Sequence, residues 1–181
     1  LGDNHKWENY YRGSRSEEKF GIKMRPSGLG DLHLCMQDAI IAAQNTVLAA
    51  EALGLGSCYI GDIVENYERL RDLLNLPSHA CPACMLIMGY PQSTERKPST
   101  PRPPVDGGVF MTDGYKDLSF EELEYQYSNH TQYNKDHKRI PLDGSRTTAD
   151  EYFGRKYTSD FMEEMNRSTS VFMTRWVEEQ E

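Results

Sequence analysis

The sequence lacks the features by which several classes of protein are recognised. No stretch approaches the ~20 apolar residues that a membrane-spanning helix needs, and the most apolar stretch, residues 39–55, is interrupted by Gln44, Asn45 and Glu51. Basic residues are also few, because 20 Lys and Arg stand against 28 Asp and Glu, which gives a net charge of −8. A nucleic-acid-binding surface needs the opposite balance. We therefore expect neither a membrane protein nor a nucleic-acid-binding protein.

The beginning of the chain carries no recognisable secretory leader. Residues 1–5 have neither a basic segment nor an apolar run. The chain does not begin with Met, so Leu1 is expected to be a processing boundary or the edge of a fragment. The chain has four cysteines, and all of them lie in or beside apolar stretches, which is typical of packed thiols in a reducing compartment. We expect a cytoplasmic protein.

One pair of cysteines, Cys81 and Cys84, forms a CxxC motif. A redox dithiol or half of a zinc site would use such a pair. No second ligand pair follows, and the motif runs directly into an apolar strand, so we interpret both thiols as packing groups. The five histidines are scattered, and none stands in a nucleophile motif such as GxSxG. The sequence predicts no metal site and no catalytic triad.

Residues 34–53 are predicted to form a long buried helix. They contain no Pro or Gly and are rich in Ala, Leu and Ile. Their apolar side chains go most of the way round, which is typical of a helix buried in a core or between subunits. Gly54 is the expected left-handed residue after its end. Next we expect a strand over Ser57–Gly61 and a helix over Tyr67–Asn75, capped by Asn66.

Other segments are predicted with less regular patterns. The leucines at 70, 73 and 74 should face the core, and a buried strand should cover Met85–Met88. We interpret residues 1–31 as a loop and residues 92–106 as a semi-rigid Pro-rich arm. The elements expected in the last third are a helix from Ser119 to Tyr127 opened by a capping box, a loop over Asn134–Thr148, and an amphipathic helix over Ser159–Glu179. The predicted apolar face of that last helix consists of Phe161, Met165, Phe172 and Trp176.

One segment carries a family resemblance. Residues 42–66, AAQNTVLAAEALGLGSCYIGDIVEN, are similar, nearly position by position, to the central segment of bacterial nitroreductases, especially the larger NADPH-dependent, oxygen-insensitive group. The later Met88-Gly89-Tyr90-Pro91 and Pro101-Arg102-Pro103 resemble further stretches of that family. The resemblance implies an α+β fold, with an antiparallel central sheet flanked by helices, in an intertwined homodimer. It also implies a single domain over residues 1–181, with the arm at 92–106 and a helical C-terminal excursion at 118–181.

The same resemblance implies a flavoprotein. FMN would pass hydride from NAD(P)H to a small-molecule oxidant such as a nitroaromatic or a quinone, while protein groups bind and tune the flavin. The residues that the resemblance assigns are Tyr59, Ile60, Gly61 and Asp62 for the isoalloxazine, Arg102 for the flavin phosphate, and Arg146 and Arg167 for the 2′-phosphate of NADPH.

The chain departs from the family pattern in three places. Family members normally carry an Arg-x-Ser-x-Arg signature in a front segment, and nothing precedes Leu1 here, so half of the flavin site is expected to be missing. Asp62 stands where near relatives often have Gly, and its carboxylate would disfavour negative charge on reduced flavin. Thr100 replaces a family Lys, for which Lys97 would substitute. Two alternatives stay open: a non-catalytic or weakly flavin-binding protein of this fold, and a different flavin reaction such as reductive dehalogenation or flavin cleavage.

Overall fold

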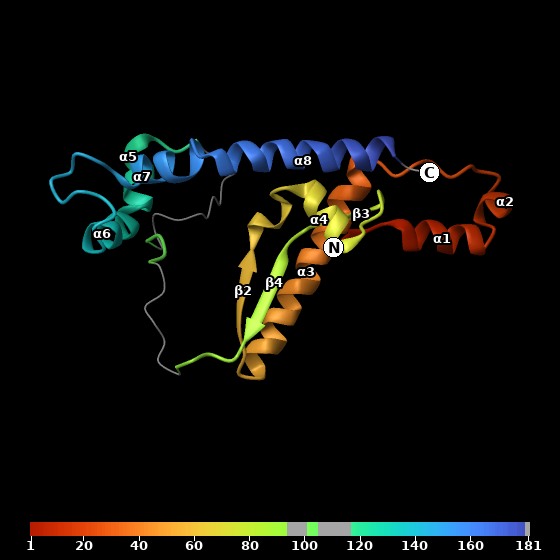
Figure 1. The fold of residues 1–181 in the computed structure, drawn as a ribbon, viewed down its shortest axis with the longest axis horizontal. Coiled ribbons are helices and arrows are strands. Elements are labelled where there is room, and N and C mark those ends of the chain that lie inside the picture. The colour runs from red at the N-terminus through yellow and green to blue at the C-terminus, as the bar shows by residue number, and fades with distance from the viewer. Residues whose placement is uncertain (94–100, 105–116, 180–181) are drawn as a thin grey trace. The chain divides into compact units, whose positions relative to one another are not determined.

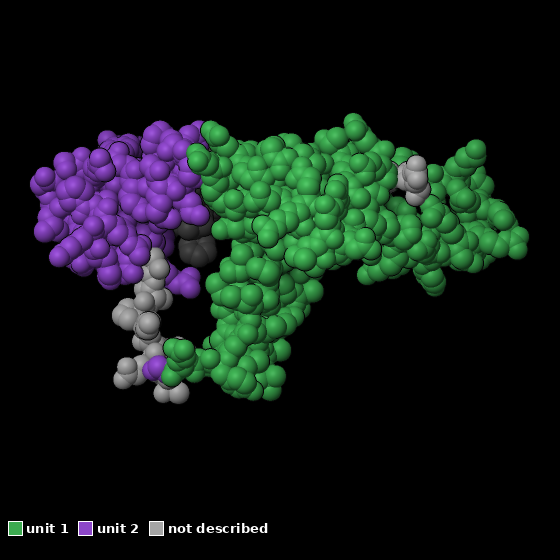
Figure 2. Space-filling model, in the orientation of Figure 1, with its two compact units in different colours: residues 1–92, 160–181 green, residues 93–159 purple. Residues whose placement is uncertain are grey.

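The computed structural model describes residues 1–93, 101–104 and 117–179 (Figure 1). The chain divides into two compact units (Figure 2). Unit 1 comprises residues 1–92 and 160–181, and unit 2 comprises residues 93–159. The expected helical excursion is therefore shared between the units, and the assignment of 1–181 to a single domain stays a prediction. Among the described residues, no helix is both long and apolar enough to span a membrane.

Unit 1 combines helices with short strands, in the order β1 (Gly2–Asp3), α1 (His5–Gly13), α2 (Ser16–Phe20), α3 (Leu29–Ala52), β2 (Gly56–Ile60), the 3₁₀ turn η1 (Gly61–Val64), α4 (Tyr67–Leu74), β3 (Ala80–Cys81), β4 (Met85–Gly89) and α8 (Asp160–Glu178). The described part of unit 2 is helical and contains α5 (Phe120–Gln126), α6 (Ser128–Asp136), α7 (Thr148–Tyr152) and the π-helical turn η2 (Phe153–Tyr157).

The described strands form two antiparallel pairs. β2 pairs with β4 from Gly56 opposite Gly89 to Ile60 opposite Met85, and this pair lies beside α3 (Figure 1). β1 pairs with β3. The expected α+β class with antiparallel sheet is confirmed. The strand expected over Ser57–Gly61 is placed one residue earlier, because Gly61 already begins the helical turn η1.

Helix α3 begins at Leu29, before the expected start. Gly28 is extended, and the carboxylate of Asp31 accepts a hydrogen bond from its N–H at 2.8 Å. Asp31 is held in turn by two hydrogen bonds from Arg25 at 2.5 and 2.8 Å. At the other end Gly54 takes a φ of +77°, as expected for the residue that follows a helix.

The expectation that α3 is buried in the core is wrong for this chain. Only Leu32 and Ala50 are buried, whereas Ile41 and Leu48 are 60% and 57% exposed. The physical reason is that unit 1 supplies a small sheet and one helix end to pack against α3, which is too little to surround it. The second alternative given by the sequence, that α3 is buried between subunits, stays a prediction.

The core of unit 1 depends on α8. Phe172 and Trp176 are buried with Tyr67, Val64 and Leu32, and Met165 packs against this cluster from one side. The amphipathic helix expected over residues 159–179 is thereby confirmed. The indole N–H of Trp176 also donates to the carbonyl of Gly28 at 3.2 Å, which fixes α8 to the chain just before α3.

Several local expectations need correction. Residues 1–31 are not a loop, because α1 and α2 form there through short-range contacts such as the Trp7–Tyr11 ring stack, without a regular apolar stripe. The first residues of the predicted loop 134–148 belong to helix α6. The side chain of Asn134 is buried and donates a hydrogen bond to Thr148 Oγ1 at 3.3 Å.

Helix α4 has the predicted position but a different buried face. Leu73 and Leu74 are 77% and 50% exposed, because α4 packs on α8 through Tyr67 at its beginning. Asn66 has a left-handed backbone, and its side chain makes no capping bond. The capping box at Ser119 is confirmed, with Glu122 N–H donating to Ser119 Oγ at 3.3 Å and Ser119 N–H donating to Glu122 Oε2 at 2.9 Å.

Replacing Phe172 with Ala should lower the free energy of unfolding by about 3–5 kcal/mol, because it leaves a cavity against Tyr67. Urea denaturation followed by circular dichroism measures this loss. Met173→Ala, at the partly exposed neighbouring position, is the matched control and should change stability much less. Equal effects of the two substitutions would contradict this account of the core.

Candidate functional site

The candidate site centres on the turn that leaves strand β2. Tyr59, Gly61 and Asp62 are exposed and Ile60 is half-buried, so the turn and the strand end before it are accessible to solvent. A Cβ atom added to Gly61 would meet no atom within 4 Å. No contact with the described residues therefore requires glycine there. Its absent side chain instead leaves the peptide backbone bare toward open space, which suits close approach by a planar ligand.

The turn is open to solvent on one side and anchored on the other. Val64 is buried, and Ile63 packs against the core cluster. The N–H of Glu65 donates to the carbonyl of Asp62 at 3.0 Å, which closes the turn. At the strand end, the phenol of Tyr59 donates to Gln44 Oε1 of α3 at 3.3 Å. The backbone of Gly61 and Asp62 is consequently held between two fixed elements.

Arg167 lies on α8 and is engaged by two carboxylates. Its guanidinium donates to both oxygens of Glu68, at 2.7 and 2.8 Å, and to both oxygens of Glu164, at 2.8 and 2.7 Å. Hydrogen bonding to Arg167 lowers the pKa of each of these carboxyls to about 2. A phosphate would have to compete with both carboxylates for this cation. The assignment of Arg167 to a nicotinamide cofactor stays a prediction.

The other two predicted arginines belong to unit 2. Arg102 is exposed, and its carbonyl accepts a hydrogen bond from Asn129 Nδ2 at 3.0 Å. Among the residues that the structure describes, none forms an ion pair with its guanidinium. Arg146 is exposed and immediately precedes Thr147, the N-cap of α7. Lys97 and Thr100 lie outside the described residues.

One thiol of the CxxC motif, that of Cys81, does not resemble a redox group. Cys81 is 1% exposed, and its thiol lies 3.6 Å from the carbonyl of Gly2, to which it donates. Burial raises the pKa of Cys81 to about 12 and also raises that of Cys35, its neighbour on α3. Both groups are therefore thiols rather than reactive thiolates at neutral pH. In the described part of the chain, no three His, Cys, Asp or Glu side chains are grouped to hold a metal ion.

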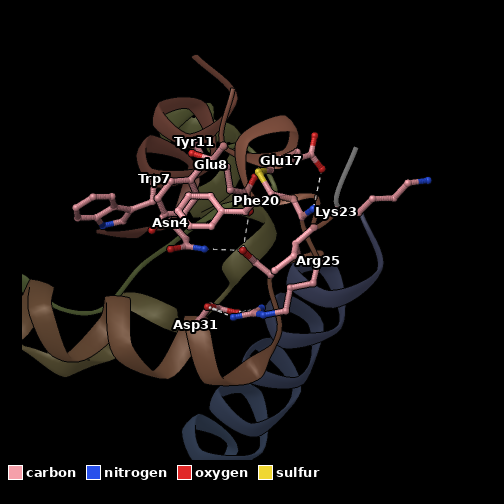
Figure 3. A pocket seen from close by; sticks show the side chains of 13 residues that line it. Asn4, Trp7, Glu8, Tyr11, Glu17, Phe20, Lys23, Arg25 and Asp31 are labelled. Atoms are coloured by element: carbon pink, nitrogen blue, oxygen red, sulfur yellow. Dashed lines mark hydrogen bonds and ion pairs between the residues drawn. The ribbon is translucent and has the colours of Figure 1, made fainter. Parts of the chain in front are cut away.

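Sequence reasoning missed a cavity of about 410 Å³ at the beginning of the chain (Figure 3). Trp7, Tyr11 and Phe20 contribute apolar surface to it. Its carboxylates are already used: Asp31 pairs with Arg25, and Glu17 accepts the N–H of Met24 at 2.7 Å. The available signal was the i, i+3, i+4 spacing of Trp7, Tyr10 and Tyr11, which places their rings on one face of a helix.

Comparison with known sequences places the exposed turn inside a shared segment. Residues 20–90 match the sequence model of the nitroreductase family. Over 170 residues the chain is 29% identical to an NADPH-dependent oxidoreductase of Staphylococcus saprophyticus, covering 88% of this chain and 66% of that relative. It is also 29% identical over 136 residues to the FMN reductase (NADPH) of Bacillus subtilis, covering 70% of this chain and 53% of the relative. The chain thus spans between about half and two thirds of the length of these relatives.

Solved structures show the same fold. A crystal structure from Bacteroides fragilis superposes with a TM-score of 0.72 at 22% identity, covering 92% of this chain and 67% of that one. The NfrA1 nitroreductase of B. subtilis superposes with a TM-score of 0.56 at 24% identity, covering 87% of this chain and 65% of that one. The nitroreductase-like fold expected from the sequence is confirmed by these likenesses.

The ion pairs of Arg167 predict a titration that can be measured directly. In an Arg167→Gln variant, the pKa values of Glu68 and Glu164 should rise from about 2 toward the ordinary range of a glutamate. Because the pKa is depressed in the folded state, the stabilisation is present above pH ~4.5 and is lost as the pH falls toward 2. Carboxyl NMR titration measures the shift. Arg155→Gln, which removes the pair with Glu151, is the control, and an unchanged Glu68 pKa in Arg167→Gln would contradict the assignment.

Proposed function

We infer that this chain belongs to the nitroreductase family, whose sequence model its residues 20–90 match, and that it forms part of an FMN-dependent oxidoreductase. Bound FMN would supply hydride transfer from NAD(P)H to a nitroaromatic, a quinone or a similar small-molecule acceptor. The observation that carries the proposal is the exposed backbone turn at Gly61 and Asp62, which lies within the matched segment and is anchored from behind by Val64.

The described residues fit two parts of such a cofactor. The bare backbone at Gly61 offers an open surface to a flat ring, beside the exposed side chain of Tyr59. The first N–H groups of a helical turn have no partner inside it, so those of Gly61 and Asp62 are suited to donate to a ring acceptor. The guanidinium of Arg102 is suited to a phosphate, because a charge-assisted hydrogen bond to an anion is among the stronger polar contacts.

The carboxylate of Asp62 would affect the reduction potential of a bound flavin. Its carboxylate is exposed at the same turn, and a negative charge there opposes the build-up of negative charge on a reduced ring. We expect it to lower the reduction potential of a bound flavin. For the nicotinamide cofactor, Arg146 is the more available of the two predicted arginines, since Arg167 is engaged by Glu68 and Glu164.

The function includes a second copy of the chain. Helix α3 exposes Leu34, Ile41 and Leu48, which are spaced seven residues apart and therefore lie on one face of the helix. Water contact with this apolar face is unfavourable, and a second α3 would remove it. We therefore propose a homodimer formed through this face. The alternative is a protein of this fold that binds flavin weakly or not at all and serves as an interaction module.

The visible spectrum tests the proposed function. The purified protein, as isolated or after addition of FMN and gel filtration, should retain a flavin absorption band that bleaches when NADPH or NADH is added without oxygen. A protein that stays colourless after incubation with FMN would overturn the oxidoreductase proposal and favour the interaction module. Bleaching by only one of the two nucleotides would identify the preferred hydride donor.

Arg102→Ala should weaken FMN binding by about tenfold to a hundredfold, because a hydrogen bond to a charged group contributes about 1.5–3 kcal/mol. Isothermal titration with FMN measures the change. Arg69→Ala removes an exposed arginine of α4 outside the candidate site and serves as the matched control. Equal FMN affinity in the Arg102 variant and the control would remove Arg102 from the site.

The dimer is tested on the exposed face of α3. Ile41→Glu combined with Leu48→Glu places two charges one heptad apart on the same face and should convert the dimer to a monomer. Light scattering coupled to size-exclusion chromatography measures the mass. Glu51→Gln, on the same helix, should leave the dimer intact. A wild-type protein that is monomeric at micromolar concentration would contradict the proposal.

A further inference from the structure

The beginning of α4 is capped by another helix rather than by its own sequence. Asn66 takes a φ of +55°, and its side chain makes no capping bond. The first N–H groups of a helix need acceptors from elsewhere. Here both acceptors come from α8: Glu164 Oε1 accepts the N–H of Asn66 at 3.1 Å, and Ser168 Oγ accepts the N–H of Tyr67 at 3.1 Å.

The two acceptors are themselves fixed. Ser168 is fully buried, and its hydroxyl donates to Glu164 Oε1 at 2.8 Å, so its oxygen is directed at Tyr67. Glu164 is held by Arg167, which also binds Glu68 in the first turn of α4. The contacts form a closed network between two helices, and no buried polar side-chain atom in the described part of the chain is left without a hydrogen bond.

This network lies directly behind the exposed turn. The turn η1 ends at Val64, two residues before Asn66, and begins where β2 is paired with β4. One end of the turn is therefore fixed by sheet hydrogen bonds and the other by α8. The left-handed backbone of Asn66 is a sparsely populated conformation that persists when its surroundings hold it.

We propose that Glu164 and Ser168 are positioning residues for the flavin-contacting turn, setting the place of the Gly61 and Asp62 backbone through the capped start of α4. The inference rests on the proposed FMN site. Without these acceptors Asn66 is free to relax toward the commoner backbone regions, and the change passes to Asp62 through the few residues between them. The contacts of Glu164 and Ser168 with this region are those to the N–H groups of Asn66 and Tyr67, so both residues act through the start of α4.

The first measurement needs no flavin. In Ser168→Ala, amide hydrogen exchange followed by NMR should show protection at Tyr67 reduced by about tenfold, the loss expected for one backbone hydrogen bond. Protection of the β2 amides, such as that of Cys58, should stay at the wild-type level. Protection lost equally at Tyr67 and throughout β2 would overturn the proposal, because Ser168 would then serve global stability alone. Unchanged protection at Tyr67 would overturn it as well.

The second measurement uses the FMN-loaded protein. Ser168→Ala and Glu164→Ala should each weaken FMN binding severalfold and shift the reduction potential of the bound flavin. Glu164→Gln keeps an acceptor oxygen and should restore most of both properties. Glu163→Ala, at the exposed adjacent position, is the control. If Tyr67 loses protection while affinity and potential stay at wild-type values, the positioning role is overturned. Failure of the wild type to bind FMN would instead overturn the proposed function, and the exchange result would still report on the cap.

Discussion

Unit 1 depends on the packing of helix α8 across three other parts of the chain. Trp176 fills the cluster and donates its indole N–H to Gly28, just before α3. Arg175 donates to the phenol of Tyr67, the first residue of α4, at 3.0 Å and to the carbonyl of Leu76, just after the end of α4, at 3.2 Å. Phe172 packs on Tyr67 between these anchors. Helix α8 thus holds α3, α4 and the turn η1 together.

Helix α8 covers only one end of α3. The N-terminal part of the helix meets α8 and β1, whereas further along it has the β2–β4 pair on one side and exposed apolar residues elsewhere. A hydrophobic helix of this kind is stable when its remaining surface is covered, and a second copy of the chain supplies matching surface by symmetry. The apolar surface of α3 that a single chain leaves exposed is the surface that the proposed homodimer would bury.

Sequence patterns predicted those features that depend on neighbours along the chain. The uninterrupted run from Leu34 gave the central helix, and the Ser119 capping box is a local device that depends on residues three apart. The apolar period of α8 likewise gave its buried face. The assignment of Tyr59 to Asp62 to a flavin came from the family resemblance alone, and it stays a prediction.

Features that depend on residues far apart in the sequence could not be predicted from local patterns. Asn66 has the composition of an N-cap, yet the acceptors for this helix lie on α8, about a hundred residues later, so no local rule could identify them. The spacing of Leu73 and Leu74 predicts that they face the core, but they are exposed, and Tyr67 is the residue of α4 that is buried. The helices of residues 5–20 were missed because they are short, are interrupted after Gly13 and bury no residue, so the helical spacing of Trp7 and Tyr11 extends over a single turn.

The cap of α4 by α8 has a consequence for the order of events during synthesis. The hydrogen bond from Tyr67 to Ser168 joins positions 101 residues apart, so it cannot form while the ribosome is still adding the intervening segment. The strand and helix on either side of Gly61 emerge early, but the turn between them gains its second anchor only after α8 has left the exit tunnel. Until then the turn is held from the β2 side alone.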